Sequence, residues 1–379
     1  MAEYPGREVT QIAAEQALAE AKPIVDDVRF LAGAGRTIDH ELVGAAVRGW
    51  SANTRRALRS DLTLWGRWCQ EQGCEPAAAG PSQVAAWIRA LSGVDSNHWE
   101  HRAMATIERY VVNIGWAYRM AGLDDPTAAP LVKLEKKAAR KKRGAAQRQA
   151  RGVRFKGDIA DVDSPASGVC LANLLKACRR DELGLRDAAL LRVAYDAGLR
   201  RSELVAVQVN HVEGPDANGA GALFIPSSKT DQAGEGAWAY LAPATLAAIA
   251  RWRDKAEIRN GPLFRRVETH FDGSVAAVGT ARLHPNSIGL IYKRLVRAAH
   301  AKKLLGEMGE QDLKQWVAGV SSHSIRVGVA QDAIAAGEGL PGIMQAYRWR
   351  DPKTVMRYGA RLAVQSGASA RLAERFREG

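Results

Sequence analysis

Five short signals in the second half of the chain offer residue types that can break and rejoin a phosphodiester. They are residues 198–204 (Gly-Leu-Arg-Arg-Ser-Glu-Leu), Lys229, the His-x-x-Arg set at 323–326, Trp349 and Tyr358. A tyrosine phenol can attack phosphorus and store the bond as a phosphotyrosine ester. Two arginine forks can neutralise the phosphate oxygens in a geometry that lysine cannot match. A histidine can move a proton near neutral pH, and a lysine can protonate the leaving oxygen, so this chemistry requires no metal and no nucleotide cofactor.

The order and spacing of these signals say more than any one of them, because each alone is common by chance. The spacing is three positions within the His-x-x-Arg set, 23 from Arg326 to Trp349, and nine from there to Tyr358. This ordered set resembles the signature of the tyrosine recombinase (phage integrase) family. Residues 323–332 and 343–358 look most like Cre-like members of that family, and the specific resemblance covers about residues 185–375.

The resemblance implies a role for each matching side chain. Tyr358 resembles the nucleophile, and His323 resembles the histidine that lies between the two phosphate-binding arginines. Arg200 and Arg326 are similar to that arginine pair. Rival residues are Arg201, which follows Arg200 directly, and Tyr347, which precedes Trp349.

Three further positions match the family's supporting residues. Lys229 resembles the general acid on a β-hairpin, with Lys255 as its rival, and Glu203 resembles an acidic residue that supports the site. Trp349 stands where Cre-like enzymes have a tryptophan whose indole N–H can donate to the phosphate; core packing is the alternative.

Composition agrees with a polyanionic partner. The chain has 379 residues and 41.0 kDa, with 46% hydrophobic and 25% charged residues, which indicates a folded protein of about two domains. Its net charge of +13 and pI near 9.8 favour nucleic acid or an acidic membrane face. The sequence contains no apolar run long enough for a membrane span, and its start resembles no signal peptide. Four cysteines without CxxC spacing argue against a zinc site. Four in so long a chain also make no disulfide framework, so we expect a cytoplasmic protein.

The elements that must position these residues form two groups. Residues 1–50 are interpreted as short helices or an arm, and residues 51–140 as a helical DNA-binding domain. Its helices are expected after the cap residues 51–54, from Pro81, from Asn97 to Met120, and from Pro126 to Arg140. Residues 166–379 are expected to form the catalytic domain, with a hairpin at 222–241, helices almost throughout from Pro243, and a tail helix at 370–376. The predicted fold class is mainly α with a small antiparallel sheet.

A strongly basic run separates the two groups. Positions 133 to 156 contain eleven lysines and arginines, and Glu135 is the single acidic residue among them. The segment 141–165 is read as a linker that is either simply solvated or a hinge that contacts phosphates.

Two sets of polar residues are candidates for reading DNA. Four arginines of the expected helical DNA-binding domain, three on its first helix and one on its third, are expected to face a major groove: Arg55, Arg56, Arg59 and Arg109. A second set lies on the helix that Pro285 opens: Asn286, Ser287 and Lys293. Solvated polar faces without a DNA role are the alternative for both sets.

The resemblance also implies partners and assembly. It implies a C-shaped clamp around a duplex target site with inverted repeats, one dimer per site and a tetramer in the synapse. Cleavage through a 3′-phosphotyrosine and strand exchange through a Holliday junction would follow. The tail helix would dock on a neighbouring protomer or on its own domain. Alternatives are a type IB topoisomerase, a telomere resolvase, a non-catalytic DNA-binding protein or, third, a protein of the membrane surface.

Overall fold

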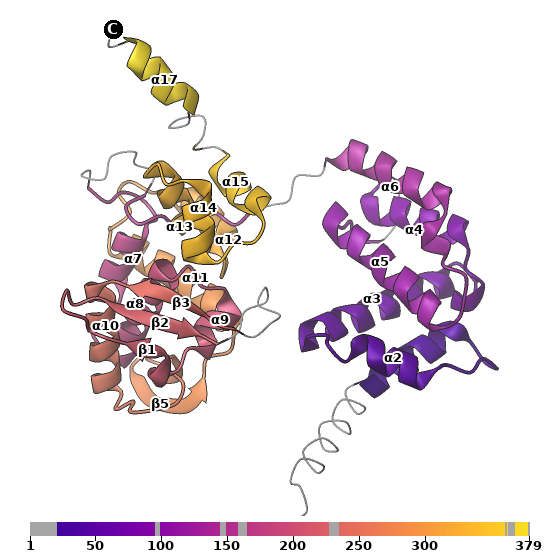
Figure 1. Ribbon diagram of the computed structural model, residues 1–379, viewed down its shortest axis with the longest axis horizontal. Coiled ribbons are helices and arrows are strands. Elements are labelled where there is room, and N and C mark those ends of the chain that lie inside the picture. Colours follow the sequence, from indigo (N-terminus) through magenta and orange to yellow (C-terminus); the bar gives the residue numbers. More distant parts are fainter. Residues whose placement is uncertain are drawn as a thin grey trace, which may run out of the picture. The chain divides into compact units, whose positions relative to one another are not determined.

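The chain divides into two units, Met1–Arg148 and Gln149–Gly379, each with its own core (Figure 1). The computed structural model describes residues 21–94, 99–144, 149–157, 165–226, 235–360, 362 and 368–377. The unit boundary lies inside the basic segment that the sequence predicts as a linker. The described part of that segment after the boundary, residues 149–157, belongs to the second unit.

The first unit is helical in the part that the structure describes. Its helices are residues 21–32, α2 (His40–Val47), α3 (Ala52–Glu71), α4 (Pro81–Ser92), α5 (Met104–Met120) and α6 (Pro130–Arg143). The Ser51 hydroxyl caps α3 by accepting a hydrogen bond from the Thr54 backbone N–H at 3.2 Å, as the cap residues predict. Two boundaries differ from the prediction: α5 begins at Met104, after an extended Ala103, and a 3₁₀ turn at Pro126–Ala128 precedes α6.

Aromatic side chains form much of this unit's core. Trp65 and Trp87 lie with ring centroids 5.1 Å apart, and Tyr110 stacks on Trp87 at 5.6 Å. Ile24 and Val43 are fully buried in the same core; they belong to the segment 1–50, for which the sequence predicts short helices or an arm. The described part of residues 1–50 is therefore packed as part of this helical unit.

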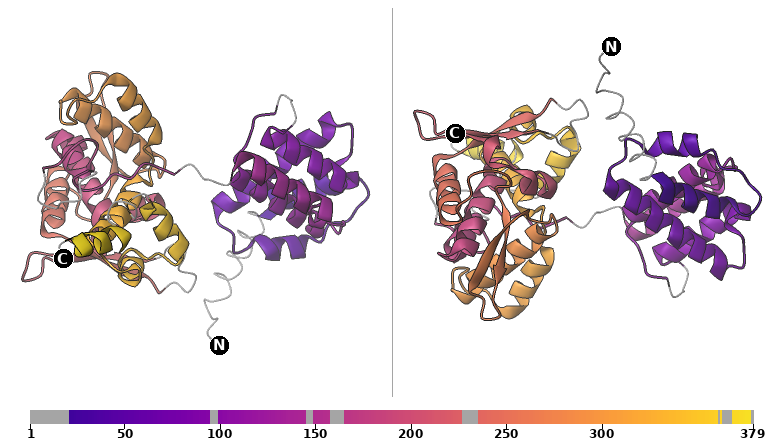
Figure 2. Two further views of the ribbon diagram at one scale, coloured as in Figure 1. Left: turned by 90° about the horizontal axis from the view of Figure 1, so that it is seen from above. Right: turned by 90° about the horizontal axis from the view of Figure 1, so that it is seen from below.

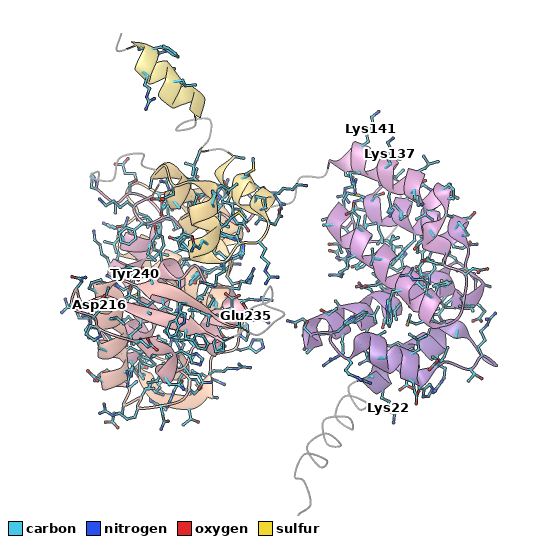
Figure 3. The ribbon with its side chains drawn as sticks, in the orientation of Figure 1. Lys22, Lys137, Lys141, Asp216, Glu235 and Tyr240 are labelled. Atoms are coloured by element: carbon cyan, nitrogen blue, oxygen red, sulfur yellow. The ribbon has the colours of Figure 1, made fainter. Side chains whose placement is uncertain are left out.

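The second unit packs helices around a small sheet (Figure 2). The sheet has the order β1-β2-β3, from β1 (Val212–Glu213), β2 (Gly221–Ile225) and β3 (Ala237–Leu241). Both pairs are antiparallel, and Leu223 lies opposite Ala239 in the register. Buried side chains alternate with the exposed Trp238 and Tyr240 along β3 (Figure 3), as expected for a sheet with one covered face.

The helices of this unit run through most of its length. They are α7 (Leu171–Ala177), α8 (Glu182–Asp196), α9 (Arg201–Ala206), α10 (Pro243–Lys255), α11 (Ser287–Ala301), α12 (Glu310–Gly319), α13 (Ser324–Ala335), α14 (Leu340–Tyr347), α15 (Pro352–Gly359) and α17 (Ala368–Arg377). The prediction that nearly everything after Pro243 is helical is wrong at β4 (Arg265–Thr269) and β5 (Val275–Arg282), which form an antiparallel hairpin. Its turn contains Asp272 and Gly273, and Gly273 adopts φ +82°, a conformation that favours glycine.

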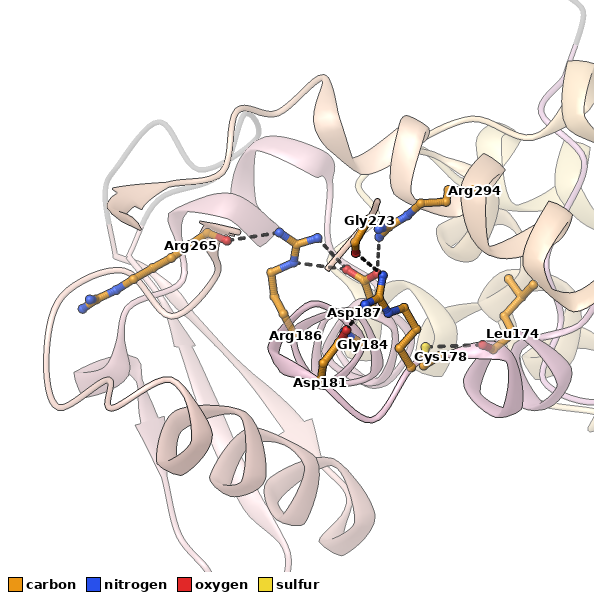
Figure 4. Close-up of polar contacts among 10 residues, drawn as sticks. Leu174, Cys178, Asp181, Gly184, Arg186, Asp187, Arg265, Gly273 and Arg294 are labelled. Carbon is orange, nitrogen blue, oxygen red and sulfur yellow. Dashed lines mark hydrogen bonds and ion pairs between the residues drawn. The ribbon is translucent and has the colours of Figure 1, made fainter. Parts of the chain in front are cut away.

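A buried carboxylate joins α8 to this hairpin and to α11 (Figure 4). Asp187 is 1% exposed and pairs with Arg186 at 2.8 Å and with Arg294 of α11. Arg186 also donates to the backbone oxygen of Arg265 in β4 at 3.3 Å. Burial raises the pKa of Asp187, and the two guanidinium groups oppose that rise.

Candidate active site

Tyr358 lies beside His323 although 35 positions separate them in the chain. The His323 Nε2 atom is 2.7 Å from the Tyr358 hydroxyl oxygen. Tyr358 lies near the end of α15, a helix that begins with Pro352 and is capped by the Asp351 carboxylate at 3.0 Å from the Lys353 N–H. His323 stands immediately before α13. Two helix ends therefore bring together a phenol and an imidazole in hydrogen-bond contact.

Arg326 lies one turn further along α13 and is buried. Its side chain is 2% exposed, and its Nη2 donates to the Tyr347 carbonyl oxygen at 3.0 Å. Its Nη1 donates to the Gly198 carbonyl oxygen. The guanidinium carbon lies 4.5 Å from the ring centroid of Trp349, a cation–π contact. These contacts fix the guanidinium group in one orientation.

Arg200 is hydrogen-bonded to Glu203. Arg200 precedes α9, and its Nη1 donates to Glu203 Oε1 at 2.7 Å while its backbone N–H donates to Oε2 at 3.0 Å. The Glu203 side chain is 3% exposed, whereas that of Arg200 is 22% exposed. The carboxylate is thus buried behind an arginine that still reaches the surface.

The charges around the site set the protonation states of His323 and Tyr358. Burial, together with the positive charges of Arg326 and Arg200, lowers the pKa of His323 to about 4, so the imidazole is neutral at pH 7. Burial raises the pKa of the Tyr358 phenol, although the nearby arginines lower it in part. At neutral pH the pair is a protonated phenol next to a neutral imidazole that can accept its proton.

The side chains of the rival residues have other contacts. Arg201 donates to the Asn286 side chain at 3.1 Å, and Lys255 pairs with Glu182 at 3.3 Å. The Tyr347 ring packs against Gly198, so that a Cβ at that glycine would lie 2.8 Å from the ring. Lys229, the predicted general acid, lies outside the described residues.

Trp349 is packed in an apolar cluster and also lies against Arg326, while donation of its indole N–H to a phosphate stays a prediction. It is 6% exposed and belongs to a small apolar cluster with Ile343 and Val355. Its ring also lies against the Arg326 guanidinium and 6.3 Å from the ring of Tyr358. The same side chain therefore packs in the core and contacts two of the candidate site residues.

The candidate DNA-contacting arginines of the first unit mostly have protein partners. Arg59 pairs with Asp27 at 2.8 Å, and Arg109 forms two hydrogen bonds with Asp61 at 2.9 and 3.0 Å. Arg55 donates to the Trp50 carbonyl oxygen at 2.7 Å, and Arg56 donates to Asn53 at 2.8 Å. Arg59 and Arg109 remain about half exposed, so their ion pairs leave part of each guanidinium in solvent.

The second candidate set lies at and beyond the start of α11. Asn286 is exposed, Ser287 and Lys293 are partly exposed, and α11 buries Ile288 and Leu295 on its other side. Asn286 accepts the hydrogen bond from Arg201, so the residue after Arg200 is joined to this helix.

Sequence reasoning missed Arg348. It lies between Tyr347 and Trp349 and has a left-handed backbone with φ +57°. Its Nη2 donates to the Ala197 carbonyl oxygen at 2.8 Å and lies 3.9 Å from Glu203 Oε2. No sequence pattern marks it, because its role depends on a turn that only the folded chain shows.

The residues that the structure describes lack two further features. No helix among them is long and apolar enough to cross a bilayer. In the same part of the chain, no three His, Cys, Asp or Glu side chains are grouped as metal ligands would be.

Known proteins align with most of this chain. The sequence profile of the phage integrase family matches residues 170–363. The chain is 27% identical to the Cre recombinase of Escherichia phage P1 over 331 residues, 86% of this chain and 89% of Cre. It is also 27% identical to an integrase/recombinase XerD homologue of Selenomonas ruminantium, over 81% of each chain.

Solved structures show the same fold at lower identity. The XerH site-specific recombinase bound to a palindromic difH substrate aligns with a TM-score of 0.53 and 11% identity, covering 92% of this chain and 96% of XerH. The Tn1549 transposon integrase in complex with transposon right-end DNA aligns at 0.50 with 13% identity, covering 87% and 97%. The predicted fold class, mainly helical with small antiparallel sheets, is confirmed. Since the family profile matches more than half of the chain, the protein belongs to the phage integrase family of tyrosine recombinases, enzymes of site-specific DNA recombination.

Proposed function

We propose that this enzyme cleaves and rejoins duplex DNA through a 3′-phosphotyrosine on Tyr358. The observation that carries the proposal is the 2.7 Å contact between the Tyr358 hydroxyl and His323, next to Arg200 and Arg326. The neutral imidazole accepts the phenol proton as the oxygen attacks phosphorus. The two guanidinium groups then stabilise the charge that develops on the non-bridging oxygens.

The rest of the reaction follows from the resemblance. The departing 5′ oxygen needs a proton, for which Lys229 is our candidate. The freed 5′ hydroxyl of a second strand then attacks the phosphotyrosine, which gives a Holliday junction within a tetramer of two dimer-bound sites. The phosphotyrosine ester conserves the energy of the broken bond, so the proposed cycle uses neither a metal nor ATP.

We also propose that both units contact the DNA, at a target site with inverted repeats. The relatives XerH and the Tn1549 integrase were solved with DNA, which supports a duplex as the partner. The net charge of +13 supports the same partner. Base contacts by Asn286, Ser287 and Lys293, and by exposed parts of the first unit's arginines, stay part of this proposal.

The proposal is tested with a nicked, suicide-type DNA substrate that traps covalent adducts. Wild-type protein is expected to form an adduct, and Tyr358→Phe is expected to form none while binding the same DNA with unchanged affinity. Tyr347→Phe serves as the matched control and should still form the adduct. Adducts that persist in Tyr358→Phe would contradict the assignment of the nucleophile, and tight binding without any cleavage by wild-type protein would favour a non-catalytic DNA-binding protein.

Assays of recombination and of DNA relaxation distinguish the proposed recombinase from a topoisomerase. Two DNA molecules that carry the target site with different flanking markers should yield recombinant products. Relaxation of supercoiled DNA without exchange of markers would instead indicate a topoisomerase-like activity.

A further inference from the structure

Arg348 has an unfavourable position for a residue that only stabilises the fold. It caps α14 with φ +57° and ψ +44°, a left-handed conformation that glycine or asparagine adopts far more readily. Its side chain is 11% exposed. The Nε and Nη1 atoms are buried and have no hydrogen-bond partner among the described residues. Both the backbone and the two unpaired donors count against stability.

The contacts that Arg348 does make lead to Arg200. Its Nη2 donates to the carbonyl oxygen of Ala197, three residues before Arg200, and lies 3.9 Å from Glu203 Oε2. Glu203 accepts two hydrogen bonds from Arg200, one from the backbone and one from the guanidinium. Arg348 therefore contacts both the turn that precedes Arg200 and the carboxylate that holds its side chain.

Arg326 joins the same two segments from α13. It donates to the carbonyl oxygen of Gly198 and to that of Tyr347. The turn at 197–200 is thus attached to the turn at 347–349 by two arginines, of which Arg326 is our phosphate ligand. Burial lowers the pKa of Arg348 and Glu203 opposes this, so the carboxylate is the counter-charge that keeps the guanidinium protonated.

We propose that Arg348 is a positioning residue that acts through Glu203 and the Ala197 turn to aim the guanidinium of Arg200 at the scissile phosphate. This inference rests on the proposed cleavage reaction. Arg348 shares the Glu203 carboxylate with Arg200 and donates to the Ala197 carbonyl oxygen, so it holds in place both the carboxylate and the turn that set the direction of the Arg200 side chain. A preorganised Arg200 stabilises the transition state more than the bound ground state.

The variants Arg348→Asn and Arg348→Lys test the proposal. Asparagine tolerates the left-handed backbone and removes the guanidinium, so the melting temperature should stay unchanged or rise. Single-turnover cleavage at saturating DNA should fall roughly 10- to 100-fold, as expected for a misplaced catalytic group, while the DNA dissociation constant stays unchanged. Lysine keeps the charge without the fork and should restore part of the rate.

Lys303→Asn is the matched control. Lys303 is an exposed cation with φ +56°, so this change relieves the same kind of backbone strain and removes one positive charge outside the site. Its cleavage rate should equal that of wild type. Wild-type cleavage by Arg348→Asn would overturn the proposal. A variant that unfolds at the assay temperature would also overturn it, because Arg348 would then be a structural residue.

A double-mutant cycle with Glu203→Gln tests the route of action. If Arg348 acts through Glu203, replacing Arg348 in the Glu203→Gln background should cost much less than in wild type. Fully additive losses would contradict this route.

A second readout separates this inference from the reaction on which it rests. Absence of adducts with wild-type protein contradicts the proposed function. The positioning role is then judged by crystal structures of wild type and Arg348→Asn. An unchanged Arg200–Glu203 pair in the variant would overturn it, and a displaced Arg200 guanidinium would support it.

Discussion

At the scale of single residues, the Tyr358–His323 pair depends on an imidazole that stays neutral. Burial and two neighbouring guanidinium groups disfavour its protonation, and the same burial keeps the phenol protonated. In the reaction that we propose, Tyr358 gives its proton to His323 only as its oxygen begins to bond to phosphorus, which removes charge from that oxygen. In this proposal the Tyr358 phenol stays protonated until a phosphate is correctly placed.

The lowered pKa of His323 predicts a pH dependence of stability. The folded-state value is about 4 against 6.5 for the free side chain, so the unfolded chain binds more protons between these values. Stability should therefore fall as the pH drops from about 6.5 to about 4, by up to about 3 kcal/mol from this group. Urea unfolding at a series of pH values measures the slope. His323→Gln should flatten it, and an equally steep slope in that variant would contradict the assignment.

Gly198 offers a second prediction at this scale. Its φ of +55° disfavours other residues, and an added Cβ would meet the Tyr347 ring at 2.8 Å. Gly198→Ala should displace the turn that carries Arg200, lower stability by about 1 kcal/mol or more, and reduce cleavage. Gly337→Ala is the matched control, because Gly337 has φ +84° but open space around it. Equal cleavage by the two variants would show that backbone strain alone accounts for the effect.

Much of the site could be predicted from residue types and order. The family resemblance predicts Arg200, His323, Arg326 and Tyr358, and the structure brings His323 against Tyr358 and Glu203 against Arg200. Arg348 could not be predicted, because its contacts follow from a left-handed turn and from carbonyl groups. Backbone acceptors have no sequence signature, so side chains that bind them escape a search by residue type.

At the scale of elements, periodic apolar patterns predicted the helices better than the second hairpin. The stripe along α3 buries Leu58, Leu62 and Trp65, as its spacing indicates. Strands β4 and β5 are mostly exposed and have little apolar alternation, so hydrophobic pattern could not reveal them. Their turn residues Asp272 and Gly273 were the available signal.

The Asp187 network predicts a stability effect at this scale. Asp187→Asn would leave the guanidinium groups of Arg186 and Arg294 without their buried counter-charge. We expect a loss of about 3 kcal/mol in the free energy of unfolding, because one partner of a buried pair is removed. Chemical denaturation measures it, with the exposed Asp312→Asn as the control. A loss no larger than that of the control would show that the network contributes little.

At the scale of the whole molecule, the basic run at 133–156 concentrates the positive charge near the boundary of the units. Part of it lies on α6, where Lys137 and Lys141 are exposed one turn apart (Figure 3). Other cations of the run form ion pairs within the protein: Arg140 pairs with Glu108, and Arg154 pairs with Asp332. The run is therefore neither wholly solvated nor wholly available for phosphates.

DNA affinity should depend on salt through the exposed part of this run. Lys137→Gln combined with Lys141→Gln should reduce the slope of log K against log salt concentration by about two, if each lysine contacts one phosphate. Cleavage at saturating DNA should stay unchanged. Fluorescence anisotropy of labelled DNA, titrated with protein at salt concentrations from about 50 to about 300 mM, measures this slope. The control, Lys22→Gln with Lys303→Gln, removes the same charge, and an equal change of slope there would indicate a mere net-charge effect.

The segment 151–157 has a practical consequence for building chimaeric enzymes. Val153 donates to the Ser324 carbonyl oxygen at 2.9 Å, and a Cβ at Gly328 would come within 2.0 Å of the Val153 carbonyl oxygen. The Asp332 carboxylate accepts hydrogen bonds from the Arg154 side chain and the Phe155 backbone N–H. It also accepts one from the Tyr195 hydroxyl at 2.6 Å. A fragment that starts at residue 166 would lack the segment 151–157 and its hydrogen bonds to α13, the helix that contains Arg326. Fusion of the catalytic unit to a foreign targeting module should therefore join ahead of Arg151.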